Sequence, residues 1–227
     1  MAVRILRGRA ETIAADRKRT ATLLDTVAER RQPAVRVWLP HRQIAFGRRD
    51  VRTDGYDRAR QRARAHDFDP VERSVGGRAV AYTGSTLAFA RVEPIGDARS
   101  DIDTRYEAVT DALSTALETL GVEANRGEPQ RSFCPGTHSL SAAGKLVGIA
   151  QRVRRTVAMT AGILLPGEHG TIATVLEDVY DALEVPFDPG SVGSVARARG
   201  SAVEPETVRA TVEDALVGDR RREIIQV

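Results

Sequence analysis

Two residue types that are scarce in this chain lie close together and could carry out chemistry. Cys134 is the only cysteine, and Lys145 is one of two lysines in a chain with 34 lysine and arginine residues. A cysteine thiolate is a nucleophile in acyl transfer, and a nearby cation favours the thiolate form. A lysine ammonium in a polar site can hold a carbonyl oxygen and stabilise the charge that develops there. The pair is therefore a candidate for acyl transfer, in which Cys134 would be the nucleophile and Lys145 the cation.

Ordinary structural roles compete with this interpretation. A lone cysteine is commonly a small buried hydrophobic residue, and Gly144-Lys145 is a common pair in turns. The neighbours of Cys134 are mostly polar or turn-forming, which argues against burial in a core. His138 is the histidine nearest to Cys134 in the sequence, but a histidine in a loop is more often solvated than catalytic. No role is assigned to it.

A second candidate segment holds two glycines between two arginines. It reads Arg73-Ser74-Val75-Gly76-Gly77-Arg78-Ala79. The glycines let the backbone approach a ligand closely, and the arginines can bind a carboxylate or phosphate through two hydrogen bonds. The competing interpretation is a β-turn at the edge of a sheet. The segment lacks the Gly-Lys-Ser/Thr ending of a P-loop and does not match the Rossmann fingerprint.

Metal chemistry is not expected. One cysteine and four scattered histidines match none of the usual ligand spacings, so we predict no metal site.

The composition limits the partners and the cellular setting. The chain has 227 residues, a net charge of +3 and 4% aromatic residues. Because basic residues are spread along the chain and few aromatics could stack on bases, no nucleic-acid partner is expected. The N-terminus lacks the apolar core of a signal peptide, and no apolar run approaches the roughly 20 residues that span a bilayer, so no membrane association is expected. A single free thiol is typical of a reducing compartment, and we predict a cytoplasmic protein.

Hydrophobic periodicity predicts an α+β fold. Helices are predicted at residues 11–30, 57–66, 100–121, 171–183 and 204–216. Strand-forming runs are predicted at residues 35–39, 43–47, 71–92 (with internal turns), 145–152 and 157–165. The first two runs are expected to form a hairpin, and residues 186–199 a loop. We therefore expect a single domain over residues 1–227, with a mainly antiparallel or mixed β-sheet core flanked by helices. Residues 190–227 are a candidate small C-terminal helical appendage.

Three segments, in this order, resemble the biotin/lipoate protein ligase family, and specifically its lipoate branch. Val37-Trp38 with Ile44 to Gly47 is similar to the family's opening hairpin, and residues 73–80 match its Arg-x-x-Gly-Gly-x-Ala-Val segment. Residues 144–152, GKLVGIAQR, are close to the family's Gly-Lys-Lys-x-Ala-Gly-x-Ala-Gln-Arg. The resemblance implies the lipoate–protein ligase catalytic-domain fold and an active-site role for Lys145. The residues it implies in acyl or substrate binding are Arg73, Gly76, Gly77, Arg78, Ala79, Gly144 and Gly148.

Within that branch, Ser132-Phe133-Cys134-Pro135-Gly136 is similar to the cysteine-dependent octanoyl amidotransferases. This resemblance implies an acyltransferase that moves an octanoyl or lipoyl group through an acyl-Cys134 thioester onto a lysine of a lipoyl carrier domain, in protein lipoylation. The implied donor is an octanoylated or lipoylated carrier such as the glycine cleavage H protein. The implied acceptors are the acidic lipoyl domains of 2-oxoacid dehydrogenases, and no cofactor beyond the acyl donor is required.

Two alternatives stay open. An ATP-dependent lipoate–protein ligase would use ATP and Mg to form a lipoyl-adenylate, with Arg73, Arg78 and Lys145 in contact with it and Cys134 incidental. A non-catalytic module would keep the fold and bind an acyl group or a carrier without turnover. A requirement for ATP distinguishes the ligase, and the absence of turnover distinguishes the binding module.

Overall fold

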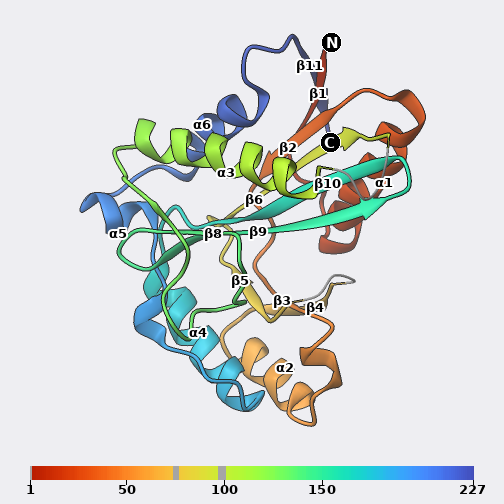
Figure 1. Ribbon diagram of the computed structural model, residues 1–227. Helices are drawn as coiled ribbons and strands as arrows, with labels where there is room; N and C mark the ends of the chain where they lie inside the picture. The colour runs from red at the N-terminus through yellow and green to blue at the C-terminus, as the bar shows by residue number, and fades with distance from the viewer. Residues whose placement is uncertain (1, 74–76, 97–100) are drawn as a thin grey trace.

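The structure is a computed structural model that describes residues 2–73, 77–96 and 101–227. Its helices are α1 (Ile13–Arg30), α2 (Tyr56–Ala65), α3 (Ile102–Thr119), α4 (His169–Ala182), α5 (Val195–Arg199) and α6 (Pro205–Val217), with 3-10 turns η1 (Asp50–Arg52) and η2 (Pro189–Ser191). Its strands are β1 (Val3–Arg7), β2 (Ala34–Trp38), β3 (Gln43–Phe46), β4 (Asp69–Glu72), β5 (Val80–Tyr82), β6 (Leu87–Pro94), β7 (Asn125–Arg126), β8 (Ser139–Ser141), β9 (Lys145–Arg154), β10 (Val157–Leu164) and β11 (Arg222–Gln226). The strands form two sheets with helices around them (Figure 1).

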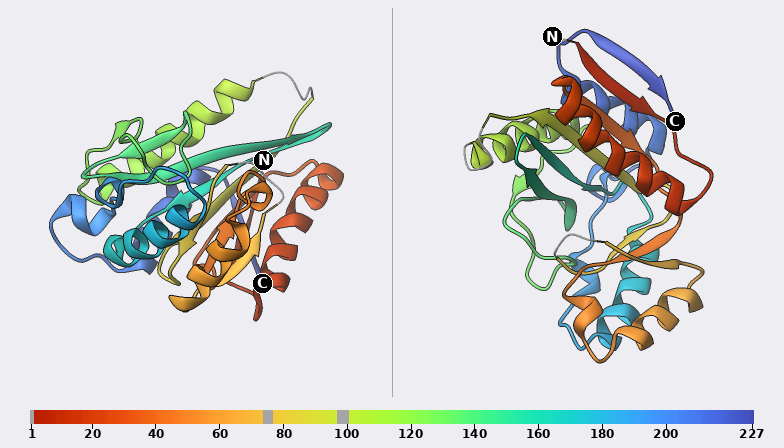
Figure 2. Two further views of the ribbon diagram at one scale, coloured as in Figure 1. Left: turned by 90° about the horizontal axis from the view of Figure 1, so that it is seen from below. Right: turned by 90° about the vertical axis from the view of Figure 1, so that its right-hand side faces the viewer.

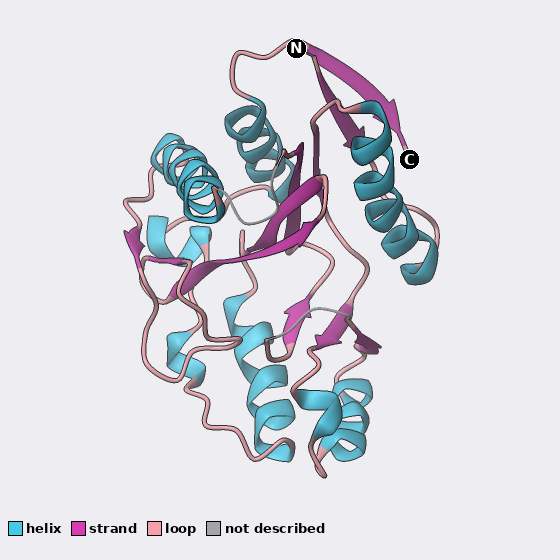
Figure 3. Cartoon of the chain, turned by 45° about the vertical axis from the view of Figure 1, so that its right-hand side comes forward, coloured by secondary structure: helices cyan, strands magenta, loops and turns pink. Residues whose placement is uncertain are grey.

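The larger sheet is mixed and, within the described residues, has eight strands in the order β11-β1-β2-β6-β10-β9-β8-β7. β1 pairs in parallel with both β2 and β11, whereas the pairs from β2 to β7 are antiparallel. The long β9–β10 hairpin and β6 lie near its centre. Helices cover this sheet, so the predicted α+β class with a mixed β-sheet core is confirmed (Figure 3).

Alternating side chains give the larger sheet two different faces. Leu87 and Phe89 of β6 enter the main hydrophobic core, which α3 and α6 cover. On the other face, α1 packs Leu24 against β2, β6 and β10. The side chains of Ala88 and Ala90 lie on that face too, and they line a cavity rather than fill it. Small residues on β6 therefore leave room for a ligand between the sheet and α1.

The smaller sheet has the order β4-β3-β5, with β3 parallel to β4 and antiparallel to β5. Helices α2 and α4 pack on it and on each other around a second core that includes Phe46, Phe68 and Leu176. Figure 1 shows this layer on the opposite side of the larger sheet from α3. The Cys134 segment also contributes to this second core, because Phe133 is buried in it.

The predicted hairpin between residues 35–39 and 43–47 is wrong. β2 is bordered by β1 on one edge and β6 on the other, so it has no free edge for β3. The turn after Trp38 instead carries the chain from the larger sheet into the smaller one, where β3 pairs with β4 and β5. The turn was correctly located, but it connects two layers rather than two paired strands.

The five long helices lie close to their predicted positions, although residue 100 lies outside the described residues. The C-terminal part differs more. The predicted loop at residues 186–199 contains η2 and α5, and an unpredicted strand, β11, follows α6 and pairs with β1. The two ends of the chain therefore lie on neighbouring strands (Figure 2). None of the helices in the described ranges has the length and apolar character needed to span a bilayer.

Candidate active site

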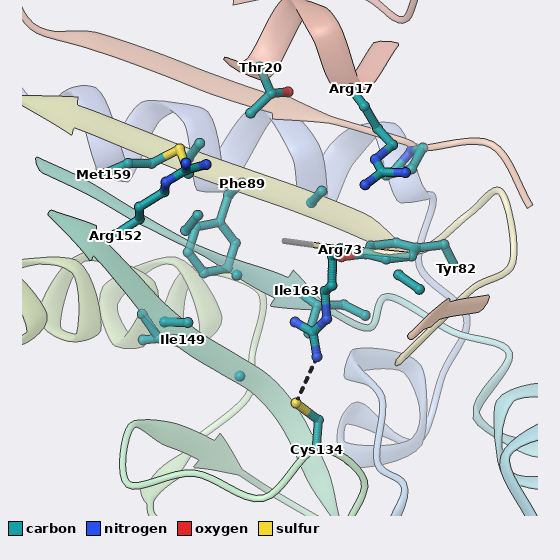
Figure 4. Close-up of a pocket in the computed structure, with 18 of the residues that line it drawn as sticks. Arg17, Thr20, Arg73, Tyr82, Phe89, Cys134, Ile149, Arg152, Met159 and Ile163 are labelled. Atoms are coloured by element: carbon teal, nitrogen blue, oxygen red, sulfur yellow. Dashed lines mark hydrogen bonds between the residues drawn. The ribbon is translucent and has the colours of Figure 1, made fainter. Parts of the chain in front are cut away.

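A cavity of about 650 Å³ lies between α1, the centre of the larger sheet and the segment around Cys134 (Figure 4). Small-molecule sites commonly measure about 300–1,000 Å³. The predicted site residues that line it are Arg73, Cys134, Lys145 and Gly148. Segments distant in the sequence thus bring the two scarce residues, Cys134 and Lys145, to one site.

Cys134 is a partly buried free thiol in a loop, at the side of the cavity. Its Sγ lies 3.2 Å from Nη2 of Arg73, which also donates to the carbonyl of Arg78 (Figure 4). Burial alone would lower the pKa of the Arg73 guanidinium, but the charge on the Cys134 sulfur and the hydrogen bond to it raise that pKa above its usual value. A cation beside a cysteine sulfur favours the thiolate, the form in which a cysteine attacks an acyl carbon.

The backbone of Cys134 is held in an unusual conformation. Its φ angle is +41°, in the left-handed region that non-glycine residues seldom adopt. Its N–H donates to the hydroxyl of Tyr180 at 2.6 Å, and that hydroxyl donates to the carbonyl of Ala79 at 3.0 Å. Burial, together with the Cys134 charge, raises the pKa of Tyr180 well above its usual value, so the hydroxyl keeps the proton that it donates. Helix α4 therefore fixes the position of the nucleophile.

Lys145 begins β9 and is only 1% exposed. Its Nζ donates to Glu128 Oε2 at 2.6 Å and to the carbonyls of Phe133 and Cys134, each at 3.0 Å. These acceptors use all the hydrogens of an ammonium group. Lys145 therefore holds the Cys134 loop in this state, and a substrate carbonyl would have to replace one of the two backbone carbonyls to reach it.

Glu128 is a site residue that the sequence analysis missed. Besides Lys145, its carboxylate accepts hydrogen bonds from the backbone N–H of Gly136 at 2.9 Å and from Oγ of Ser139 at 2.7 Å. It thereby ties both ends of the loop that follows Cys134 to the buried ammonium. A buried lysine needs an anionic partner, so one was to be expected, but its identity among 31 acidic residues had no sequence signal.

The predicted glycines have different structural roles, and Gly76 lies outside the described residues. Gly77 has φ +90°, and a Cβ there would lie 2.8 Å from Cys134 Sγ and 3.0 Å from Arg73 Nη2. Gly148 faces the cavity beside Lys145, where a Cβ would be 3.4 Å from Cε. Gly144 has φ +110° and packs against the backbone of Gly193, away from the cavity lining. Gly77 is therefore the glycine that makes room for the nucleophile.

Arg78 and Ala79 do not line the cavity. Arg78 donates from Nη1 to the fully buried carboxylate of Asp50 at 3.2 Å, and Gly47 donates its N–H to the same carboxylate. Burial raises the pKa of Asp50, while the Gly47 and Arg78 hydrogen bonds oppose that shift. Of the predicted arginine pair, only Arg73 faces the site.

The rest of the cavity offers an apolar wall and a basic side. The wall is built from strand residues that are small or branched, namely Ala88, Ala90, Gly148, Ala150, Ala161, Gly162 and Ile163. Phe89 fills the space where a side chain at Gly162 would lie. Cations come from Arg17 of α1 and Arg152 of β9 (Figure 4). Lys18 of α1 also lines the cavity. Both lysines of the chain thus line one cavity, which suits a ligand with an apolar chain and a nearby anionic group.

A family model described as the lipoyl protein ligase A/B catalytic domain matches residues 14–217. The chain is 32% identical over 195 residues to an octanoyl-[GcvH]:protein N-octanoyltransferase of Exiguobacterium sibiricum. This match covers 81% of this chain and 68% of the relative. It is 27% identical over 166 residues to a lipoyl-[GcvH]:protein N-lipoyltransferase of Listeria monocytogenes, covering 70% and 58% respectively. The chain belongs to the lipoyl protein ligase A/B catalytic-domain family. The predicted membership of the lipoate branch is confirmed, and the chain is an enzyme.

A solved structure of a lipoate-protein ligase A bound with ATP has the same fold. It superposes with a TM-score of 0.75 at 18% sequence identity and covers 99% of this chain and 90% of that one. The predicted lipoate–protein ligase catalytic-domain fold is therefore confirmed.

Proposed function

We propose that this enzyme transfers an octanoyl or lipoyl group onto a lysine of a lipoyl carrier domain through an acyl-Cys134 thioester. The observation that carries the proposal is the pairing of Cys134 Sγ with Arg73 at 3.2 Å beside an apolar cavity. The names of the Exiguobacterium and Listeria relatives support the transferase class and both acyl groups.

In the first step, the Cys134 thiolate attacks the acyl carbonyl, and the acyl chain lies along the apolar wall. Arg73 stabilises the thiolate before attack, and Gly77 lets the sulfur and guanidinium approach each other. In the second step, the ε-amine of an acceptor lysine attacks the thioester. Splitting the transfer replaces one difficult step with two easier ones.

Lys145 and Glu128 hold the loop that carries the nucleophile. The ammonium donates to the carbonyls of Phe133 and Cys134, and the carboxylate accepts from Gly136 and Ser139. The predicted contact of Lys145 with the substrate oxygen stays a prediction. It requires the substrate to displace one backbone carbonyl, while the hydrogen bond from Lys145 to Glu128 is kept.

The proposed donor is the octanoylated or lipoylated glycine cleavage H protein, because the names of the relatives specify octanoyl-[GcvH] or lipoyl-[GcvH]. The proposed acceptors are the acidic lipoyl domains of 2-oxoacid dehydrogenases, which suit Arg17, Lys18 and Arg152 at the cavity. Because the donor arrives with its acyl group already attached, no ATP, Mg or other cofactor is required.

Intact mass spectrometry of the enzyme incubated with octanoyl-H protein tests the proposal. A mass increase of one octanoyl group is expected in the wild type and not in Cys134→Ala, followed by its loss when a lipoyl domain is added. The ATP-dependent alternative predicts that Cys134→Ala still modifies lipoyl domains when octanoate and ATP are supplied. That result would overturn the thioester mechanism.

A further inference from the structure

Transfer between two amines requires a proton to move twice. In acylation, the donor lysine nitrogen leaves an amide and must gain a proton, because an amine anion is a very poor leaving group. In deacylation, the attacking acceptor amine must lose one. A side chain beside Cys134 that carries a single proton in both directions would serve both steps.

Most titratable groups of the cavity cannot serve as that carrier. The Lys145 ammonium needs all its hydrogens for Glu128 and two carbonyls. The Asp16 carboxylate accepts from Arg36 at 2.5 Å, from the Trp38 indole at 2.9 Å and from the N–H of Ala10 at 3.1 Å. Arginine side chains stay charged at any physiological pH.

The remaining lysine and tyrosine of the cavity are also unsuitable. Burial raises the pKa of Tyr82, which takes its proton further from exchange at neutral pH. Lys18 is exposed on α1 rather than on the Cys134 loop.

His138 lies in the Cys134 loop, and its ring nitrogens have no hydrogen-bond partner among the described residues. It follows Cys134 by four positions in the same loop and lines the same cavity. Its ring stacks on Tyr106 with centroids 3.6 Å apart and planes within 8°, and its carbonyl accepts from Ile149 N–H at 2.9 Å. These contacts fix the ring without using its nitrogens, neither of which is hydrogen-bonded to a residue that the structure describes.

The other three histidines form hydrogen bonds with residues outside the cavity and do not line it. His41 contacts the carbonyl of Ala10 at 2.8 Å, His66 contacts Asp178 at 2.8 Å, and His169 contacts Ser194 at 3.2 Å. His138 is thus the histidine whose ring is held by stacking and faces the site.

The loop geometry holds Cys134 and His138 on one loop at one cavity. Glu128 binds Ser139, the residue after His138, and Lys145, which in turn binds the carbonyl of Cys134. The segment from Cys134 to Ser139 therefore folds around one buried ion pair, with Cys134 and His138 both turned to the cavity.

We propose that His138 is the general acid–base of the acyl transfer, an inference that rests on the proposed function. The enzyme starts with a Cys134 thiolate and a His138 imidazolium. The thiolate forms the C–S bond, the amide C–N bond breaks, and the imidazolium gives its proton to the leaving donor amine. The neutral acceptor amine then forms a new C–N bond, the C–S bond breaks, and the imidazole takes the proton of the attacking nitrogen. Thiolate and imidazolium are both regenerated.

A change of leaving group separates this role from a structural one. With octanoyl-H protein as donor, His138→Gln is expected to form acyl-Cys134 about 10²-fold or more slowly than the wild type. With p-nitrophenyl octanoate, whose phenolate leaves without a proton, the variant is expected to acylate Cys134 at close to the wild-type rate. The ester reaction also shows that the variant has folded with a working nucleophile.

His66→Gln is the matched control, since that histidine lies outside the cavity, and it should behave as wild type with both donors. Equal rates for His138→Gln and wild type with octanoyl-H protein would overturn the proposal, as would equal losses with amide and ester donors. Failure of the wild type itself to take the acyl group from octanoyl-H protein would instead count against the proposed function.

Discussion

The Cys134 sulfur lies between the Arg73 guanidinium and Gly77. No room remains beside Gly77 for a larger residue. A Cβ at position 77 would lie 2.8 Å from Cys134 Sγ and 3.0 Å from Arg73 Nη2. Gly77→Ala is therefore expected to push the pair apart and slow acyl-enzyme formation by about 10²-fold, as small misplacements of reacting groups do. The measurement is the rate of the mass increase in single-turnover experiments.

Gly84→Ala is the matched control for this variant. Gly84 has φ +96°, close to that of Gly77, but a Cβ there meets nothing within 4 Å. Both alanines lie at a positive φ, which costs an L residue about 1–2 kcal/mol, so the contacts with Cys134 and Arg73 are what distinguish the two variants. Equal rates for Gly77→Ala and Gly84→Ala would show that the close contact has no role.

Arg73 is expected to set the reactivity of the Cys134 sulfur. Arg73→Gln removes the positive charge 3.2 Å from Sγ, and alkylation of Cys134 by iodoacetamide near neutral pH should slow by about tenfold because less thiolate is present. Arg78→Gln provides the comparison, since its guanidinium binds Asp50 rather than the sulfur. Faster or unchanged alkylation in Arg73→Gln would contradict the pairing.

Individual site residues were predictable from the sequence where their residue type is rare in the chain. Cys134 and Lys145 were identifiable by scarcity and spacing, and Arg73 by its place beside the glycines. Glu128 and Tyr180 were not, because their roles depend on contacts across 17 and 46 positions of the chain. Arg78 was assigned to the ligand, but a buried carboxylate on η1 binds it instead.

Helix α4 is coupled to the active site through one hydroxyl. Tyr180 accepts from the N–H of Cys134 and donates to the carbonyl of Ala79, and its side chain is 1% exposed. Tyr180→Phe leaves both groups without this partner, so the free energy of unfolding is expected to fall by about 1–3 kcal/mol. Urea denaturation measures this. Tyr56→Phe, which removes an exposed hydrogen bond to Glu72, should change stability much less.

The loop between β7 and β9 depends on the Glu128–Lys145 pair. Glu128→Gln leaves the buried ammonium without its anionic partner, and unfolding stability is expected to fall by about 3 kcal/mol, together with the transfer rate. Glu107→Gln is the control, because Glu107 pairs with Arg126 at the exposed surface, where solvent screening leaves an ion pair little effect on stability. Equal stability in the two variants would contradict a structural role for the pair.

Element positions were predictable from periodicity, but strand pairing was not. The stripes of Leu113 and Leu117 in α3 and of Val175 and Val179 in α4 are visible in the sequence and are buried in the structure. A four-residue turn after Trp38 is equally compatible with a hairpin and with a change of layer. The neighbours of β2 decide between them, and these come from residues 4–5 and 88–92.

The whole molecule carries a modest positive charge, and part of it lies around the cavity. If acidic carriers are the partners, kcat/KM for a carrier substrate should fall by about tenfold as salt is raised, because steering by charge is screened. Lys18→Glu should cause a similar loss at low salt, whereas Arg64→Glu on α2 makes the same change in net charge away from the cavity. Equal effects of the two variants would contradict recognition at the cavity.

The arrangement of the whole chain was accessible mainly through resemblance. Local patterns cannot place β11 beside β1, because that pairing joins the two ends of the chain. They also cannot show that α1 covers a cavity. The cavity depends on the small residues Ala88, Ala90 and Gly162, which come together only when β6 pairs with β10. The family's motifs conveyed this architecture because they belong to a known fold.

The most direct test of the account is the intact mass of the enzyme after incubation with octanoyl-H protein and no ATP. Acyl transfer through Cys134 predicts a wild-type enzyme heavier by one octanoyl group, an unmodified Cys134→Ala variant, and release of the group onto an added lipoyl domain. An octanoylated lipoyl domain produced by Cys134→Ala at the wild-type rate would contradict it.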